Sequence, residues 1–379
     1  MTSLWWQLRG PNRFVSRVAE ELRAGKNVTL CLPEHTTDGL AEAIRVRLGD
    51  GESWPWYTIH ADEQPDVKPI QILYARFVPG TTPDAIENTY GLVKEESFSG
   101  KIVWLDHFSK STWPAWKEFL REYEHACGAR SVFERTLFCT ELKGELSLDP
   151  PIEDVRLSLQ AYRGCVSSLD MLLYASYLAS EDAPTDLSSS VLIWVTAQLA
   201  QWDPRLAEVL VRCDLPDVLS PLPVLRRLQA ERGWDRQDSA QHSDSQYWAS
   251  GIVDWVDGER KMHSAFLPNG DSANLIGQRI WSGEVSVLLP YVEDRRQQTL
   301  KDLKGILRVP FTTRFGEIIS DLADLEIGHI ETQLNMNGSS VNPEKKNHIR
   351  RLREIRNSLA HLQPVSLNLL LEEGVENGK

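Results

Sequence analysis

One hexapeptide near the end of the chain combines residue types that suit chemistry on a phosphate ester. It reads Arg-Asn-Ser-Leu-Ala-His and runs from Arg356 to His361. An imidazole gains and loses protons near neutral pH, and a guanidinium stabilises negative charge on phosphate oxygens. These six residues are therefore the first candidates for a functional site.

The spacing of apolar residues predicts a helix over Lys345–Leu362 that carries the hexapeptide. Five residues form one apolar stripe, which is the expected core face: Ile349, Leu352, Ile355, Leu359 and Leu362. Four others share an adjoining polar sector: Arg350, Arg353, Asn357 and His361. Asn357 and His361 lie one turn apart. Arg356 projects at the margin of the stripe, where a guanidinium needs a partner or a cleft.

The Arg-Asn-x-x-x-His pattern, with the small Ala360 beside the His and Pro364 beyond it, resembles the motif of HEPN domains. In that family an Arg and a His lie on a late helix of a helical bundle. The stretch from Asp324 to Ile330 is similar to the family's upstream helix, in which an acidic residue, here Glu326, faces the motif. The resemblance covers roughly residues 280 to 373.

In catalytic HEPN proteins two protomers pair, and their Arg and His residues cut RNA without a metal ion. The resemblance implies that His361 is the general acid or base, that Arg356 clamps the phosphate, and that Asn357 orients His361. Arg350 and Arg353 would hold the RNA backbone. It further implies a homodimer through the C-terminal helices and no cofactor for this module.

Other interpretations of the C-terminal helices stay open. The polar sector can simply be solvated, with Arg356 in a structural ion pair. Many HEPN domains serve as dimerisation or adaptor modules. Prokaryotic proteins that join an NTPase-like module to a HEPN unit resemble components of antiviral defence or abortive infection systems, whose other subunits would be protein partners. The chain is expected to be either such an endoribonuclease or a non-catalytic assembly subunit.

The loop from Pro33 to Leu40 follows an expected strand and precedes an expected helix, where nucleotide-binding proteins hold phosphate. A phosphate loop needs several glycines and a Lys. This loop has one Gly and no Lys, and Glu34 and Asp38 would repel phosphate. A degenerate scaffold is therefore favoured over a working nucleotide site.

In layout the N-terminal region resembles AAA-like or STAND-like P-loop ATPases. Asp106, after the apolar run Ile102–Leu105, looks like their magnesium-holding aspartate. The resemblance implies a degenerate nucleotide site made of Thr36, Thr37, Gly39 and Asp106. If ATP and magnesium bind there, the domain is an ATP-driven switch; if not, it is a partner-binding scaffold.

Residues 1–150 are expected to form an α/β domain with a parallel sheet, because short apolar runs alternate with amphipathic stretches. The expected strands are Val28–Leu32, Trp56–His60, Ile102–Asp106 and Thr136–Cys139. The expected helices are Phe14–Leu22, Leu40–Leu48 and Trp113–Tyr123. The double proline Pro150–Pro151 predicts the end of this domain.

An all-α domain is expected over 151–240, including Leu159 and Tyr162, followed by a linker and mixed segment over 241–280. The polar stretch Asp235–Gln246 is expected to be an exposed loop. A four-helix HEPN-like bundle is expected over 281–379. Its helices are predicted at Glu284–Leu307, Phe315–Leu334, Lys345–Leu362 and Val365–Glu373.

Composition sets further limits on function. The net charge of -13 argues against a chain that coats nucleic acid through a global positive field, although a local basic patch is compatible with it. The five cysteines lack metal-binding spacing and are expected to be reduced thiols. Neither a signal peptide nor a membrane-spanning stretch is evident, so a cytoplasmic protein without a membrane partner is expected.

Overall fold

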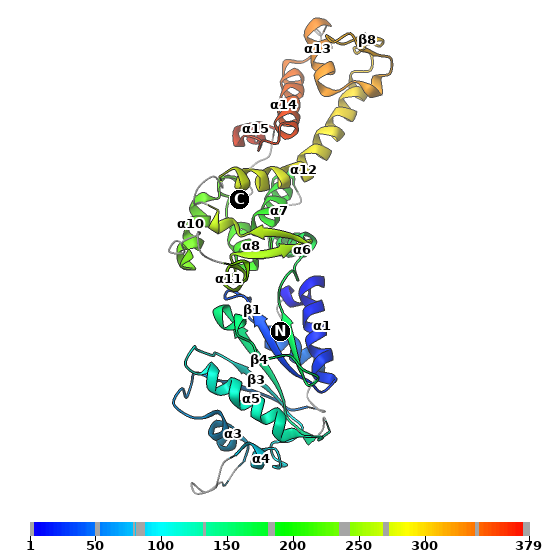
Figure 1. Ribbon diagram of the computed structural model, residues 1–379. Helices are drawn as coiled ribbons and strands as arrows, with labels where there is room; N and C mark the ends of the chain where they lie inside the picture. Colours follow the sequence, from blue (N-terminus) through cyan, green and yellow to red (C-terminus); the bar gives the residue numbers. More distant parts are fainter. Residues whose placement is uncertain are drawn as a thin grey trace. The chain divides into compact units, whose positions relative to one another are not determined.

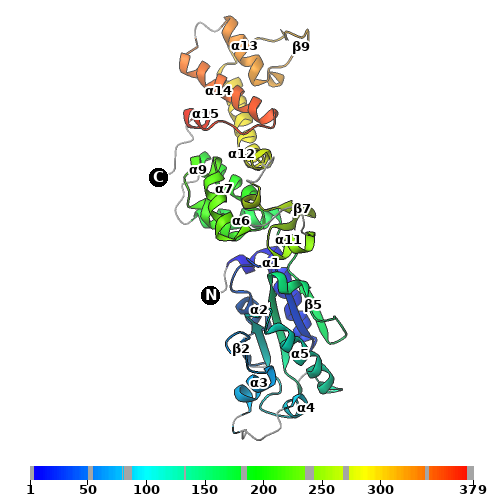
Figure 2. The same cartoon turned by 60° about the vertical axis from the view of Figure 1, so that its left-hand side comes forward.

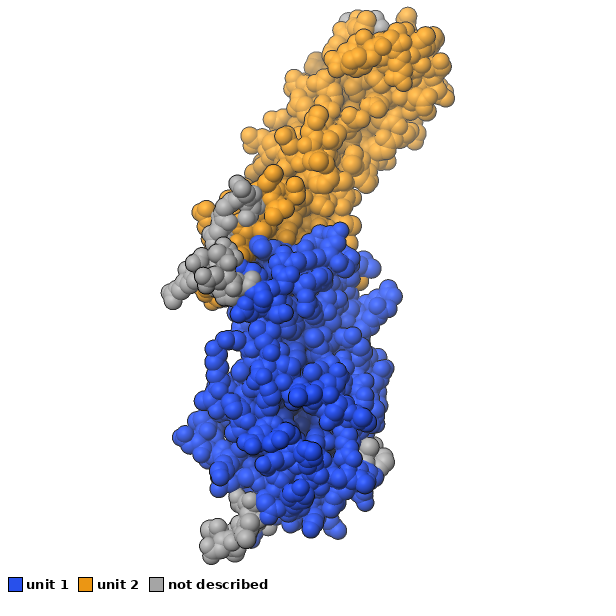
Figure 3. Space-filling view, in the orientation of Figure 1, with its two compact units in different colours: residues 1–170, 237–263 blue, residues 171–236, 264–379 orange. Residues whose placement is uncertain are grey.

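The computed structural model describes residues 4–49, 54–78, 80, 88–131, 134–180, 186–234, 243–267, 273–337 and 341–373. The chain divides into two units, which Figure 3 shows in blue and orange. Unit 1 comprises residues 1–170 and 237–263, and unit 2 comprises residues 171–236 and 264–379. In the described part of the chain, no helix is long and apolar enough to cross a membrane.

Unit 1 is built on a five-stranded parallel sheet (Figure 1). Its strands are β1 (Asn27–Leu32), β2 (Trp56–His60), β3 (Ile102–Asp106), β4 (Leu137–Lys143) and β5 (Leu157–Ala161). They lie in the order β2-β3-β4-β1-β5. All residues of β1 and β3 are buried, as expected for central strands covered on both faces.

Helices flank this sheet, with α1 and α5 on opposite sides of it in Figure 1. In the described part of the chain, five α-helices precede β4 in the sequence: α1 (Arg9–Arg23), α2 (Leu40–Leu48), α3 (Pro69–Phe77), α4 (Thr89–Leu92) and α5 (Trp113–Cys127). An aromatic core that includes Phe119, Tyr123 and Phe138 joins α5 to the sheet. The remaining elements of unit 1 are α11 (Asp244–Ala249) and the hairpin of β6 (Val253–Val256) and β7 (Glu259–Met262).

Unit 2 is mainly helical. Its first helices are α6 (Ser168–Ser180, which begins at the end of unit 1), α7 (Leu187–Ala200), α8 (Pro204–Val211), α9 (Leu215–Leu219) and α10 (Leu222–Glu231). The later helices are α12 (Ala273–Asp302), α13 (Ile327–Asn337), α14 (Pro343–Ala360) and α15 (Leu367–Glu372). The long helix α12 packs against both α7 and α14 (Figure 2). A small hairpin, β8 (Phe311–Thr312) with β9 (Ile318–Ile319), lies between α12 and α13 in the sequence.

The expected α/β layout with a parallel sheet is confirmed for the N-terminal region. All four predicted strands are present. The prediction that helical structure begins at residue 151 was wrong, because Leu157–Ala161 forms β5 and pairs with β1. Leu159 therefore lies in a strand, opposite Thr29.

Two predictions for the later part of the chain also need correction. The helix expected over Phe315–Leu334 begins only at Ile327, because the chain first turns through the β8–β9 hairpin. Of the polar stretch Asp235–Gln246, residues 235–242 lie outside the described residues, and Asp244–Gln246 belong to α11 rather than to a loop. The HEPN-like bundle over 281–379 stays a prediction.

Candidate functional site

The hexapeptide lies at the C-terminal end of α14, as predicted for the helix that carries it. Asn342 starts this helix, because its side chain accepts a hydrogen bond from the backbone N–H of Glu344 at 2.9 Å. Four residues of the predicted core face are buried: Ile349, Leu352, Ile355 and Leu359. The indole of Trp281 on α12 donates to the carbonyl of Leu359 at 2.8 Å. The end of α14 is thereby anchored to a neighbouring helix.

His361 is the residue at which α14 ends, and its side chain is exposed. Its backbone N–H donates to the carbonyl of Asn357 at 3.0 Å, so the two residues are one turn apart, as predicted. In the described part of the chain, no hydrogen bond joins their side chains. The prediction that Leu362 belongs to the core face was wrong: it follows the helix end with φ 59° and is 63% exposed.

Arg356 has the acidic partner that the sequence suggested. Its guanidinium donates to the Oε2 atom of Glu326, just before α13, at 2.9 Å. Both side chains are well exposed. Together they line a shallow hollow of about 330 Å³, whose other wall contains Glu293 and Arg296 of α12. Neither Asn357 nor His361 lines this hollow.

The charges on the α12 wall of the hollow are paired with each other. The Arg296 guanidinium binds Glu293 at 2.7 Å and also donates to the carbonyl of Leu325 at 2.8 Å. The hydrogen bond from Arg296 lowers the pKa of the Glu293 carboxyl to about 2. Glu293 is therefore ionised throughout the physiological range. Among the described residues, the hollow is lined by three acids, Glu293, Asp324 and Glu326, and by two cations, Arg296 and Arg356.

The two other arginines of the polar sector also have acidic partners. Arg350 lies 3.9 Å from the Glu354 carboxylate on the same helix, and Arg353 forms an ion pair with Glu331 of α13. The Arg350–Glu354 pair is exposed, and such pairs contribute only about 0–1 kcal/mol, whereas the Glu331 side chain is largely buried. A phosphate group can therefore replace Glu354 at Arg350 at little cost, but replacing Glu331 at Arg353 would leave a buried carboxylate without its cation.

The expected nucleotide loop of unit 1 forms a turn that is held by hydrogen bonds within the loop and to Trp6 and Ala249. The Thr36 hydroxyl donates to the Pro33 carbonyl at 2.7 Å, and Gly39 starts α2 with φ 90°. Strand β4 lies between β1, which precedes this loop, and β3, which ends at Asp106. Among the described residues, no hydrogen bond or ion pair joins Thr36, Thr37 or Gly39 to Asp106.

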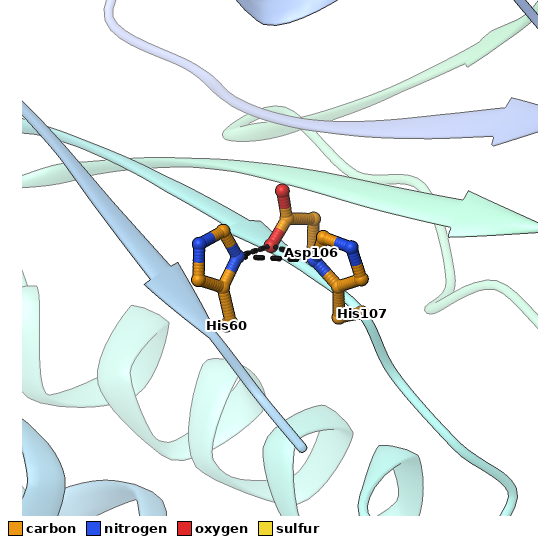
Figure 4. A group of neighbouring side chains, drawn as sticks. All are labelled: His60, Asp106 and His107. Atoms are coloured by element: carbon orange, nitrogen blue, oxygen red, sulfur yellow. Dashed lines mark hydrogen bonds and ion pairs between the residues drawn. The ribbon is translucent and has the colours of Figure 1, made fainter. Parts of the chain in front are cut away.

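Asp106 instead forms a cluster with two histidines (Figure 4). Its Oδ1 atom lies 2.5 Å from Nδ1 of His60 and 2.9 Å from Nδ1 of His107. The two Nδ1 atoms are 3.0 Å apart. The other carboxylate oxygen, Oδ2, accepts a hydrogen bond from the indole N–H of Trp104 at 3.0 Å. Three potential ligand atoms therefore converge on one point.

His60 and His107 were not among the residues predicted from the sequence. His60 ends β2 and lies directly opposite Asp106 in the parallel register of β2 and β3. His107 is the next residue after Asp106. The signal was available, because side chains at the carboxyl ends of neighbouring parallel strands meet at one edge of the sheet.

Comparison with known proteins adds little to these observations. No protein-family model matches the chain, and no curated protein matches it. The chain is similar to the solved structure of a mutant of Thermotoga maritima RuvB, with a TM-score of 0.35 and 12% sequence identity. The match covers 67% of this chain and 93% of the RuvB chain. A TM-score this low carries no argument, and the candidate sites therefore depend on their own geometry.

Proposed function

We propose that the C-terminal helices are a HEPN-type, metal-independent endoribonuclease module, and that the chain is a component of a prokaryotic antiviral defence or abortive infection system. The observation that carries this proposal is the end of α14, where Arg356 and His361 are both accessible on an anchored helix. Accessible cation and imidazole groups on a rigid element are what phosphodiester cleavage needs.

The reaction that these residues can support is attack of the ribose 2′-hydroxyl on the adjacent phosphate. One imidazole removes the hydroxyl proton, a protonated group returns a proton to the 5′-oxygen that leaves, and a guanidinium stabilises the negative charge that develops on the phosphate oxygens. The base and the acid act on opposite sides of the phosphorus. His361 of one chain can act on only one side of the phosphorus, as either the base or the acid. His361 of a second copy can supply the other group, and the proposed active form is therefore a homodimer.

Cleavage of RNA in the presence of EDTA tests this function. The wild-type chain, with total RNA or tRNA as substrate, is expected to cleave, whereas His361→Ala and Arg356→Ala should each lower the rate by about 100-fold or more. His125→Ala and Arg314→Ala are matched controls, since both are exposed residues outside the proposed site. Wild-type protein that does not cleave, or cleavage that survives both active-site replacements, would contradict the proposal.

The Glu326–Arg356 pair gives a second test within the same site. Glu326→Gln should strengthen RNA binding severalfold, because Arg356 becomes free to meet a phosphate and a repelling carboxylate is removed. The free energy of unfolding should change by less than about 1 kcal/mol, since the pair is exposed. Binding is measured by fluorescence anisotropy with labelled RNA.

Glu344→Gln is the control for Glu326→Gln. It makes the same change in net charge, and it lies at the opposite end of α14 from Arg356, about 18 Å along the helix axis. Equal gains in RNA affinity for the two variants would show that only overall charge matters, and would count against a role for the Glu326–Arg356 pair.

A non-catalytic assembly subunit is the second candidate function. It is favoured by the carboxylate partners that Arg350, Arg353 and Arg356 already have. On this proposal α14 supports dimerisation, and the degenerate NTPase-like domain binds a protein partner. Wild-type protein that dimerises but neither binds nor cleaves RNA would support it.

A further inference from the structure

We propose that His60, Asp106 and His107 bind one divalent transition-metal ion, of which zinc is the best representative. The site lies at the carboxyl ends of β2 and β3 in unit 1 and is independent of the function proposed for α14. Each of the three residues offers one ligand atom to a common centre.

The spacing of the three ligand atoms fits a metal centre after a small expansion. Their separations are 2.5, 2.9 and 3.0 Å. Ligands about 2.0–2.1 Å from a tetrahedral zinc ion are about 3.3 Å apart. Small rotations of the two imidazole rings, both partly exposed, would open the cluster by the required amount.

Hydrogen bonds alone do not satisfy the three side chains of this cluster. If both histidines carry their proton on Nδ1, two N–H groups that donate to one oxygen face each other across 3.0 Å and repel. If one histidine carries no proton on Nδ1, the lone pair of that nitrogen faces the Oδ1 atom of Asp106 with no hydrogen between them, and the two atoms repel. A divalent cation accepts all three lone pairs at once and neutralises the carboxylate.

The surroundings of Asp106 support a ligand role. Asp106 is 7% exposed, and a buried carboxylate is stabilised by a cation beside it. The hydrogen bond from Trp104 to Oδ2 fixes the carboxylate so that Oδ1 is turned toward the imidazoles. Partners that orient metal ligands in this way are a regular part of metal sites. Trp104 is therefore a positioning residue of the proposed site.

The backbone of His107 supports the same conclusion. Its φ of 52° lies in the left-handed region, which is unfavourable for a residue with a Cβ atom. This conformation places His107 back over its neighbour Asp106, where Figure 4 shows the three side chains together. Strained backbone of this kind tends to occur where function requires it.

The ligand set selects the class of ion. Two imidazole nitrogens and one carboxylate oxygen suit zinc and other late first-row metals, whereas magnesium and calcium prefer oxygen alone. Three protein ligands leave one position of a tetrahedron vacant. The side chains of His60 and His107 are 40% and 69% exposed, so that position faces solvent and can take water or a substrate atom.

Metal titration of the full chain tests the proposal. Protein stripped with EDTA and dialysed is titrated with zinc in competition with a chromophoric chelator, and separately with cobalt(II), whose visible absorption reports a tetrahedral site. One ion per chain is expected. His60→Gln, His107→Gln and Asp106→Asn should each weaken binding at least about 100-fold, and Trp104→Phe should weaken it about 10- to 100-fold.

His125→Gln is the matched control, because it removes an exposed imidazole of the same unit outside the cluster. It should leave the stoichiometry and the cobalt spectrum unchanged. Circular dichroism confirms that each variant is folded, and His107, the most exposed ligand, is the replacement least able to disturb folding. Failure to bind zinc at one ion per chain with a dissociation constant below about 10 µM, or binding that survives the ligand replacements, overturns the proposal.

Discussion

Glu284→Gln is expected to stabilise the protein strongly at pH 8 and to leave its stability nearly unchanged near pH 4. Glu284 lies on α12 with no exposed surface. Burial raises the pKa of its carboxyl from 4.5 to about 8, and the hydrogen bond from the backbone N–H of Val365, at 2.8 Å, offsets only part of this effect. Its Oε1 atom has no hydrogen-bond partner within the described residues. Glutamine has the shape of the protonated acid and does not ionise.

The sign of the pH dependence follows from the raised pKa. Below pH 4.5 the carboxyl is protonated in both the folded and the unfolded chain, so its contribution to stability is complete. As the pH rises from 4.5 through about 8, the unfolded chain loses the proton and the folded chain keeps it, so stability falls. At about 1.4 kcal/mol per pKa unit the loss amounts to about 4–5 kcal/mol, which Glu284→Gln removes.

Urea unfolding of the wild type and Glu284→Gln at pH 4.5, 6 and 8 measures this difference. Glu293→Gln is the control on the same helix. Arg296 lowers the pKa of Glu293 to about 2, so this carboxylate stabilises the fold above pH 4.5 and loses that effect as the pH falls toward 2. Its replacement should be mildly destabilising at pH 8. A stability difference between the wild type and Glu284→Gln that does not change with pH would refute the expectation.

The sheet of unit 1 was largely predictable because its central strands are apolar on both faces. Runs such as Ile102–Asp106 leave few alternatives to a buried strand. The edge strand β5 was missed since its residues are partly exposed and it follows a double proline. Only its pairing with β1, which lies about 130 residues earlier in the chain, makes it a strand.

The error at residues 315–326 has a local cause. The backbone of Gly316 has φ 84°, and the N–H of Thr313 bonds to the carbonyl of Glu317 at 2.8 Å, which closes a tight turn between β8 and β9. A Gly between two short runs of β-branched and aromatic residues is a hairpin signal. The helical spacing of the later residues concealed it.

The candidate sites were predictable only as far as one helix or one strand determines them. The apolar face of α14 follows from periodicity, and four of its five predicted members are buried. The His60–Asp106 contact depends instead on the pairing of β2 with β3. The Arg356 contact depends on how Glu326, just before α13, is placed beside α14. Such contacts between separate elements leave no periodic signal in the sequence.

Gly283→Ala is expected to destabilise unit 2 by about 2–3 kcal/mol, although alanine favours helices. Gly283 lies on α12 where this helix meets α7. A Cβ atom at this position would lie 2.7 Å from Cα and 2.8 Å from the backbone N of Val195. Backbone atoms cannot rotate away as a side chain can, so the two helices must separate. Because the interior is closely packed, this separation removes van der Waals contacts along both helices.

Gly277→Ala on the same helix is the matched comparison. There an added Cβ meets nothing closer than the Cγ of Pro364 at 4.0 Å. Because the added Cβ atom has room, the effect on stability comes from helix propensity alone. Alanine should therefore raise the free energy of unfolding by about 0.5–1 kcal/mol. Thermal unfolding of the two variants should therefore shift the melting temperature in opposite directions from the wild type. A rise in the melting temperature of both variants would mean that α12 and α7 do not pack as closely as the Gly283 contact requires. The substitution and the helix are the same, and only the neighbouring backbone differs.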